Sequence, residues 1–342
     1  MQNRIEKQIP LLNIDGSLTD PGWATEPVFQ YNRDRIHAPW YRRKEWDYYC
    51  ITGPDIALGF TLSDIGYLGF YAFSLMLFGE GRHISSNPFS FFPAGRTGFS
   101  TNSLEDNTVR SLHSRFKLEY KVQGDLRIIR INDPDFDNKT GISGEIAVHR
   151  DPEKDSMVIA TPFKEDPRYF YYNEKVNNMP AEGELKWGRQ TLKITADKYF
   201  TVLDWGRGVW PYKNTWYWSS GSGKDIEGHM FGFNLGYGFG DTSAATENML
   251  FYEGNAHKLD TVTFEFDHSN VLKPWKFTSN DGRFEMDFQP LVDRNGKTDL
   301  IFLKTVQHQV FGKFSGKAVL DNGKEIQVKD YTGFAEKVFN QW

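Results

Sequence analysis

The sequence predicts an all-β protein built from antiparallel sheets that form sandwiches or barrels. Short stretches of alternating apolar and polar residues recur along the chain, separated by Gly, Asp and Asn turn residues. Strands do not alternate with long helices, which argues against a parallel, nucleotide-binding sheet. Helical periodicity is scarce, and a short helix is expected only at residues 331–338, where Phe334 and Val338 are four residues apart.

In the first half, alternation predicts strands at residues 117–122 and 126–131, joined at Gly124-Asp125. Two further strands are expected at residues 144–150 and 156–161. They flank Asp151-Pro-Glu-Lys-Asp, whose composition indicates the turn of a hairpin.

In the second half, residues 261–267 alternate cleanly and predict another strand. A hairpin is expected where two strands bracket Asn280-Asp281-Gly282. Another is expected around Asp321-Asn322-Gly323, because Asn-Gly between alternating segments is a strong hairpin signal.

The chain has 342 residues, too many for one small domain and suitable for two. The polar stretch at residues 173–183 is the best linker candidate. The predicted boundary is therefore near residue 180, which divides the chain into domains 1–180 and 181–342.

Charge and composition exclude several classes of protein. With 40 basic and 45 acidic residues the net charge is −5, which gives no basis for nucleic-acid binding. The uncharged run at residues 65–79 is too short for a membrane-spanning helix, so stable membrane insertion is not expected. The single cysteine, Cys50, cannot form an internal disulfide, and residues 1–7 lack the apolar segment of a secretory signal. A cytoplasmic location is expected, and the oligomeric state stays open.

Aromatic residues are abundant, at 16% of the chain, with ten tryptophans. Such a content can fill a large β core or line a deep apolar cavity. In a strand at residues 215–220, Trp216, Trp218 and Ser220 would share one face. Together with Trp205 and Trp210, these tryptophans would form an apolar wall whose ring faces can also stabilise a cation.

Charged residues accompany these tryptophans. Asp204, Arg207 and Lys213 are expected in or beside the loop before the strand, where polar site residues often lie. Asp204 is a candidate proton donor, and Tyr212 or Lys213 a candidate assisting donor. Alternatively, Asp204 and Arg207 pair with each other and fix the loop.

Glu247 is a second candidate acid. In a strand from Thr246 it would share a face with Met249 and Phe251, and an apolar environment raises the pKa of a carboxyl group. A salt bridge to Arg207 or Arg294 is the structural alternative.

Four more residues complete the predicted ligand-binding set: Trp46, Asp241, Asn248 and Asp287. In a strand, Trp46, Tyr48 and Cys50 would lie on one face, with Glu45, Asp47 and Tyr49 on the other. The preceding Arg42-Arg43-Lys44 is either a solvated rim or a guide for an acidic head group. Asp241 and Asn248 belong to a glycine-rich stretch without the Lys-Ser/Thr ending of a phosphate loop. Asp287 alternates with aromatic residues, so its carboxyl group faces either solvent or the interior.

The eight histidines show no zinc-binding spacing, and no metal is expected.

The sequence resembles the family known as domain of unknown function 2804, over most of the chain. The motifs that carry this resemblance are Asp204-Trp-Gly-Arg-Gly-Val-Trp-Pro-Tyr, Trp216-Tyr-Trp-Ser-Ser-Gly, Gly232-Phe-Asn-Leu-Gly-Tyr-Gly-Phe-Gly-Asp-Thr-Ser, Thr246-Glu-Asn, Phe284-Glu-Met-Asp-Phe, Gly312-Lys-Phe-Ser-Gly, Gly333-Phe-Ala-Glu-Lys and Glu45-Trp-Asp-Tyr-Tyr.

A more distant resemblance is to tocopherol cyclases. It rests on the order of Trp205-Gly206, Pro211, Trp216 and Trp218, and on Glu45-Trp-Asp-Tyr-Tyr. Together with carotenoid hydratases and some fungal pericyclases, these proteins imply two packed lipocalin-like antiparallel barrels, an apolar small molecule, proton transfer and no redox cofactor. The chain departs from the tocopherol cyclase pattern at Ser219-Ser220-Gly221, so that substrate does not carry over.

The leading hypothesis is that an apolar or amphipathic small molecule binds in a tryptophan-lined cavity and undergoes cofactor-independent acid–base chemistry. The enzyme would be a hydratase or lyase, or a cyclase or isomerase, with Asp204 or Glu247 as the proton donor. The alternatives are a carrier of lipid-like ligands and a carbohydrate-active enzyme that pairs Asp204 with Glu247 or Asp287.

Overall fold

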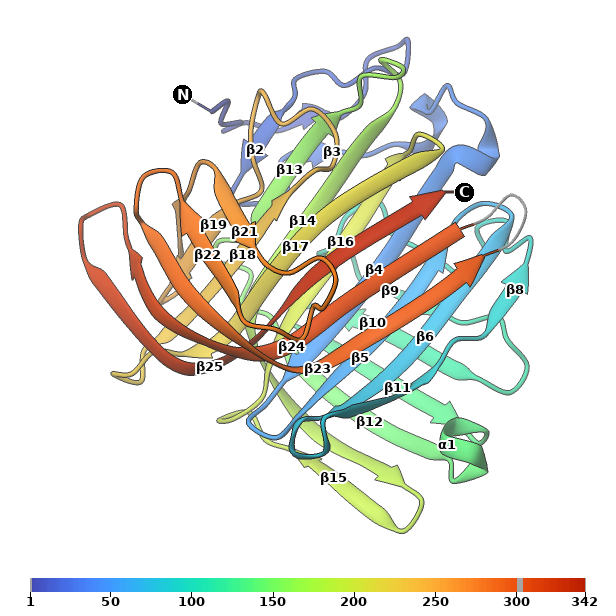
Figure 1. The fold of residues 1–342 in the computed structure, drawn as a ribbon. Coiled ribbons are helices and arrows are strands. Elements are labelled where there is room, and N and C mark those ends of the chain that lie inside the picture. The colour runs from blue at the N-terminus through green and yellow to red at the C-terminus, as the bar shows by residue number, and fades with distance from the viewer. Residues whose placement is uncertain (1, 300–303, 342) are drawn as a thin grey trace.

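The computed structural model describes residues 2–299 and 304–341, and almost all of its regular structure is β. Two large antiparallel sheets curl into half-barrels and pack against each other (Figure 1). Among the described residues, the helical elements are one short helix, α1 (Phe136–Lys139), and three 3-10 turns at Arg33–Arg35, Trp40–Arg42 and Phe78–Glu80. No helix in the described part of the chain has the length and apolar character needed to cross a membrane.

The first sheet takes its strands from the first two thirds of the chain. In spatial order they are β7 (Arg82–Ser86), β6 (Leu68–Leu77), β5 (Ile56–Asp64), β4 (Arg43–Thr52), β16 (Phe200–Val209), β14 (Phe170–Trp187), β12 (Ile142–His149), β11 (Leu126–Asp133), β10 (Lys117–Gln123) and β9 (Asn107–Arg110). Four strands branch from this path: β13 (Met157–Pro162) and β15 (Gln190–Ile194) on β14, β2 (Gly22–Ala24) on β13, and β8 (Phe89–Phe91) on β6. A separate parallel pair joins β1 (Ile9–Pro10) to β3 (Phe29–Gln30).

The second sheet contains the rest of the chain, coloured yellow to red in Figure 1. Its order is β20 (Asn255–Lys258), β19 (Met249–Tyr252), β18 (Met230–Tyr237), β17 (Lys213–Lys224), β25 (Glu325–Gln341), β24 (Lys304–Val319), β23 (Phe284–Asp299), β22 (Trp275–Ser279) and β21 (Val262–Glu265).

Alternating side chains explain why these segments form half-buried strands. In β10, Leu118, Tyr120 and Val122 are buried while the residues between them reach solvent. The predicted hairpins β10–β11, β22–β23 and β24–β25 are confirmed by their antiparallel pairing.

The predicted linker at residues 173–183 is wrong, because this stretch is the middle of β14. Its polar side chains lie in a strand that contacts other polar groups, so their composition reflects buried partners rather than a flexible connection. The chain passes from the first sheet to the second between Val209 and Lys213, not near residue 180.

Two other local expectations are also wrong. Strands β12 and β13 do not form a hairpin, because each pairs with a different part of the long strand β14. Residues 331–338 are strand rather than helix: they continue β25, and Phe334 and Val338 lie on it as buried strand residues. Pairing with β17 and β24 on either side overrides the helical spacing.

The two sheets meet across a buried, largely aromatic interface. Strands β4, β6, β7, β14 and β16 of the first sheet contribute to it, together with β17, β18, β23 and β25 of the second. Trp46 and Trp216, one from each sheet, both pack on this contact. The interface is separate from the core inside the first barrel, which contains Tyr49, Tyr172 and Trp205.

Candidate functional site

A row of polar residues crosses the face of the first sheet that contacts the second. Lys175 on β14 is opposite Asp204 on β16, and Asp204 is opposite Tyr48 on β4. Directly paired residues point to the same side of a sheet, so these three side chains face the interface together. All three are buried.

A second row crosses the facing side of the other sheet. Trp218 on β17 is opposite Glu336 on β25, which is opposite Gln309 on β24 and then Arg294 on β23. The rows contact each other, and the rings of Tyr48 and Trp218 meet edge to face at a centroid distance of 6.1 Å. The Lys175 ammonium lies 3.9 Å from the ring centroid of Trp218, and the Tyr48 hydroxyl donates a 3.0 Å hydrogen bond to Gln309.

Lys175 and Asp204 form a buried ion pair, with Nζ and Oδ2 2.9 Å apart. Asn173 donates a 2.6 Å hydrogen bond to the other carboxylate oxygen of Asp204. The Asp204 carboxylate therefore has a partner at each oxygen. This arrangement excludes the predicted alternative in which Asp204 pairs with Arg207.

Glu336 is a second carboxyl group in the cluster. It accepts a 2.7 Å hydrogen bond from Nε1 of Trp216. Burial raises the pKa of Glu336 to about 7, although the Trp216 hydrogen bond and the charges of Arg294 and Lys175 act against that rise. Glu336 can therefore hold or release a proton near neutral pH.

Glu247 is the third carboxyl group, two residues before β19 begins. Burial of the carboxyl raises its pKa, against the attraction of Lys175 and a hydrogen bond from Asn234. The Asn234 amide donates to Glu247 at 3.3 Å and accepts from Nε1 of Trp218 at 2.7 Å. A Cβ atom on Gly236 would lie 2.2 Å from Oε1 of Glu247, so only glycine leaves room for this carboxyl. The raised pKa agrees with the expectation from sequence, and Asn234 takes the place of the arginine considered there.

Aromatic rings adjoin the three carboxyl groups. Trp210 makes edge contacts with Trp46, Trp216 and Phe239, at centroid distances of 5.0, 5.9 and 4.7 Å. Tyr171 stacks on Trp46 at 6.1 Å. Trp46 and Trp216 are partly exposed, so the edge of this aromatic wall reaches solvent.

Trp205 and Arg207 do not belong to this wall, contrary to the sequence prediction. They lie in β16 rather than in a loop, on the opposite face from Asp204 and inside the first barrel. There the Arg207 guanidinium stacks on Trp205 at 3.9 Å and donates to Asp47 at 2.9 Å.

The remaining predicted residues are dispersed. Tyr212 and Lys213 are exposed at the start of β17, and Asp241 lies 3.7 Å from Lys164 at the surface. Asn248 is buried and structural, since its side chain accepts from the Gly236 backbone and donates to the Asp260 carbonyl. Asp287 is exposed on β23, beside a small pocket of about 160 Å³.

Sequence reasoning missed Lys175, Glu336 and Asn173. Lys175 and Asn173 were assigned to a linker, and Glu336 was assigned to a helix. A signal was present: the run Phe170-Tyr-Tyr-Asn-Glu-Lys places three polar residues directly after aromatic strand residues. Such a pattern is typical of buried polar groups in a sheet.

A possible metal-ligand group lies elsewhere, at the β17–β18 turn. Ligand-type atoms of Asp225, Glu227 and His229 all lie within 4.8 Å of one another. The Asp225 carboxylate already accepts from the backbone amides of Glu227 and His229, which explains the group as a turn-stabilising motif.

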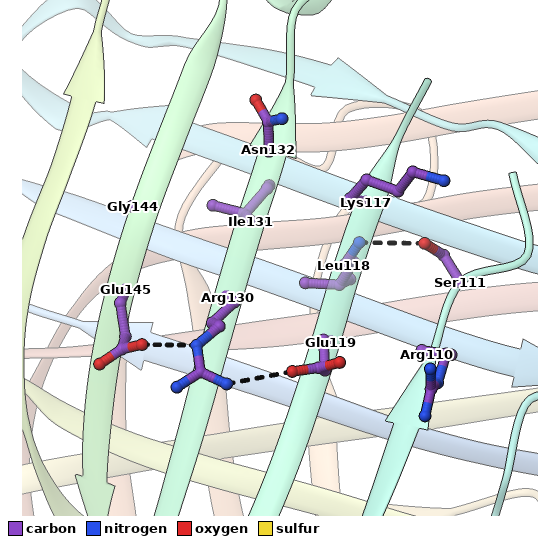
Figure 2. Close-up of a pocket in the computed structure, with 10 residues that line it drawn as sticks. All are labelled: Arg110, Ser111, Lys117, Leu118, Glu119, Arg130, Ile131, Asn132, Gly144 and Glu145. Atoms are coloured by element: carbon purple, nitrogen blue, oxygen red, sulfur yellow. Dashed lines mark hydrogen bonds and ion pairs between the residues drawn. The ribbon is translucent and has the colours of Figure 1, made fainter. Parts of the chain in front are cut away.

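A surface pocket of about 600 Å³ lies over β9 to β12 (Figure 2). Arg130 donates there to Glu145 at 2.6 Å and to Glu119 at 3.1 Å, and all three side chains are at least partly exposed. These mutually paired surface charges contrast with the enclosed carboxyl groups of the inter-sheet cluster.

Comparisons with known proteins identify the fold. A putative AttH from Nitrosomonas europaea superposes with a TM-score of 0.57 at 11% identity, covering 92% of this chain and 98% of that one. CghA solved with Sch210972 gives a TM-score of 0.52 at 11% identity, covering 87% and 88%. These likenesses confirm the predicted fold of two packed lipocalin-like barrels.

Among curated proteins there is no match. A family model, however, matches residues 2–342, which is nearly the whole length. The chain therefore belongs to the family described as Domain of unknown function (DUF2804).

Proposed function

We propose that the inter-sheet cluster is the active site of a cofactor-independent enzyme that acts on an apolar or amphipathic small molecule. The reaction would be an addition or elimination of water, or a cyclisation or isomerisation, driven by proton transfer. One observation carries the proposal: Lys175 forms an ion pair with Asp204, and its charge also acts on the carboxyl groups of Glu247 and Glu336, between two barrels and beside an aromatic wall.

The environments of these carboxyl groups suit different roles. Glu336 and Glu247 have raised pKa values because of burial, so each can carry the proton that a general acid donates. Asp204 is ion-paired with Lys175, which suits a proton acceptor. A proton donor and a proton acceptor in one enclosed site are the usual basis of acid–base catalysis.

The tryptophans support the chemistry in a second way. The Lys175 ammonium already lies over the face of Trp218, so this ring face is placed to stabilise positive charge. A cationic transition state on an apolar substrate would gain the same stabilisation from Trp216 or Trp218. Tyr212 and Lys213, at the exposed start of β17, would act only on a substrate group that extends toward solvent.

The comparisons add support for the class of ligand. CghA, which shares this fold, is solved with the small molecule Sch210972. A small-molecule ligand between or within the barrels is therefore the expected partner here. A carrier function without chemistry is the competing possibility, and the experiment below separates the two.

The test is a time course of purified protein with a small-molecule extract of its source organism, followed by mass spectrometry. We expect one compound to disappear well beyond the molar amount of protein, with a product that differs in mass by water or not at all. Depletion only to stoichiometry, with the compound recovered intact, would instead establish a carrier.

Matched variants connect turnover to the cluster. Asp204→Asn and Glu336→Gln remove one carboxylate each at nearly constant volume and should abolish turnover. Glu184→Gln makes the same kind of change at an exposed carboxyl on β14 and should leave the rate unchanged. Full activity in both cluster variants would refute the assignment.

A further inference from the structure

A second surface stands apart from the site: a patch of exposed aromatic rings, here called the aromatic patch. Its side chains are 41% to 67% exposed, although large aromatic groups are usually buried. Every exposed Phe and Trp of the described residues belongs to it. Its members are Trp40, Tyr41, Phe70, Phe89, Phe91 and Phe92.

The aromatic patch is continuous. Phe70 on β6 is directly opposite Phe89 on β8, and Phe89 contacts Phe91 at a centroid distance of 5.3 Å. Phe92 bridges Phe91 and Trp40 at 6.5 and 6.4 Å. Strand β8 lies at the right margin of the molecule in Figure 1, at the periphery of the first sheet.

The backbone beneath the rings is fixed by hydrogen bonds. The Phe92 amide donates to the Tyr67 carbonyl at 3.0 Å, and Arg96 donates to the Pro93 and Phe92 carbonyls at 3.0 Å. Gly66 lies at a φ of 91°, where a Cβ atom would be 2.9 Å from the Trp40 carbonyl oxygen. The backbone that carries the rings is therefore fixed by hydrogen bonds and close packing, so the rings point outward from an ordered segment.

Basic residues accompany the rings. The three segments that form the patch, residues 40–44, 65–70 and 88–96, contain Arg42, Arg43, Arg96 and the buried Lys44, and the acidic residues that flank them, Glu45 and Asp64, are buried. The three arginines reach solvent at least in part. The exposed charge of the patch is therefore positive, although the whole chain has a net charge of −5.

We propose that the aromatic patch docks the protein peripherally on an anionic lipid surface. Aromatic side chains favour the boundary between water and hydrocarbon, because their rings bury apolar area at the level of the head groups. Basic residues close to an anionic membrane are attracted by its negative surface potential. The two signals together are what stable peripheral binding requires.

Charge argues against a second copy of the chain as the occupant. In a two-fold dimer the same patch lies on both sides, so Arg42 and Arg96 of one copy would approach those of the other. Like charges in such an interface oppose association. An anionic lipid surface can bury the rings in its apolar region and attract the arginines with its negative charge.

The aromatic patch also adjoins the aromatic wall of the inter-sheet cluster. The Trp210 amide donates to the Arg42 carbonyl at 3.2 Å, and Trp210 packs on Trp46 and Trp216. Membrane docking would place the open edge of that wall near lipid. The docking proposal stands without catalysis, because it rests on surface residues alone.

The experiment is co-sedimentation of purified protein with vesicles of phosphatidylcholine, with or without phosphatidylglycerol. We expect binding to the anionic vesicles, weakened by salt, and little binding to phosphatidylcholine alone. The double variant Phe91→Ser and Phe92→Asn should bind about tenfold or more weakly, since two rings no longer bury apolar area in the membrane. Asn is chosen because Phe92 has a φ of 50°, which asparagine tolerates.

The matched control is Ile226→Ser with Leu272→Ser, two exposed apolar residues outside the patch. This variant should bind vesicles like wild type. Three results would each overturn the proposal: no binding of wild type to anionic vesicles, equal loss in the control, or a solution dimer that the Phe91/Phe92 variant converts to monomer. A Phe89→Ser variant checks that a loss does not come from misfolding of the loop after β8, and it should weaken vesicle binding as well.

Discussion

Lys175 and Asp204 lie directly opposite each other on β14 and β16, and their ion pair of 2.9 Å is buried against the second sheet. The ammonium is enclosed on one side by this carboxylate and on the other by the face of Trp218. The pair therefore connects two strands of the first sheet and also contacts the second sheet. Its loss should weaken both the first sheet and the packing between the barrels.

Replacing Lys175 by Met should destabilise the protein by about 3–5 kcal/mol, because Asp204 would remain as a buried charge without its partner. Urea denaturation measures this as a lower midpoint. The double variant Lys175→Met with Asp204→Leu should recover much of the loss, since neither charge is then left unpaired. A single-variant loss below about 1 kcal/mol would mean that the pair behaves like a solvated surface ion pair.

Glu336 should make stability depend on pH near neutrality. Its pKa rises from 4.5 in the unfolded chain to about 7 in the fold, because of burial. Between these values the folded state holds a proton that the unfolded state has lost, so stability falls as pH rises from about 4.5 to about 7. The total effect is about 3 kcal/mol. Glu336→Gln should remove this slope in denaturation curves measured from pH 5 to pH 8, and an identical slope in the variant would contradict the assignment.

Glu174 should act in the opposite sense, inside the first barrel. Burial alone would raise its pKa, but Arg150 at 2.5 Å and the hydroxyls of Ser103 and Ser156 lower it overall. A lowered pKa adds stability above the ordinary value of 4.5, and this stability is lost as pH falls through the folded value. Wild type should therefore lose stability in acid more steeply than Glu174→Gln. At neutral pH the variant should be about 3–5 kcal/mol less stable, because Arg150 is left unpaired.

Gly206 should not tolerate a side chain. A Cβ atom there would lie 1.9 Å from Cζ2 of Trp46, so Gly206→Ala must displace a ring that packs on Tyr171 and Trp210. We expect a loss of about 3 kcal/mol, seen as a lower Tm. Gly79→Ala is the matched control, because nothing lies within 4 Å of the added atom. The double variant Gly206→Ala with Trp46→Leu replaces the clashing ring by a smaller side chain. Its loss of stability should be smaller than the sum of the losses in the two single variants.

The sequence predicts where strands lie better than it predicts which strands pair or pack against each other. Alternation placed Trp46, Tyr48 and Cys50 on one face of β4, and the structure puts this face at the interface between the sheets. The same rule gave Trp216 and Trp218 a common face. Periodicity reports only which residues share a face, and says nothing about which distant strand lies opposite.

The errors at the site have the same origin. Asp204 and Arg207 were expected in or beside a loop, yet they lie in β16, where Gly206 and Gly208 allow close approach of Trp46 and Trp210. Lys175 and Glu336 were missed because buried polar residues in a strand resemble a linker or a helix until their partners are known. Lys175 is held by Asp204 and Trp218, and Glu336 by Trp216, all of them distant in sequence, so no local pattern contains these partners.

The order of the strands along the chain has a consequence for biosynthesis. Every strand of the first sheet precedes residue 210, whereas Glu336 lies on the final strand, β25. During translation, the first sheet can form while Lys175, Asp204 and Trp46 still face water or a chaperone. The ribosome must release the last strand before the cluster closes, so a prematurely terminated chain would expose the aromatic interface and present a surface prone to aggregation.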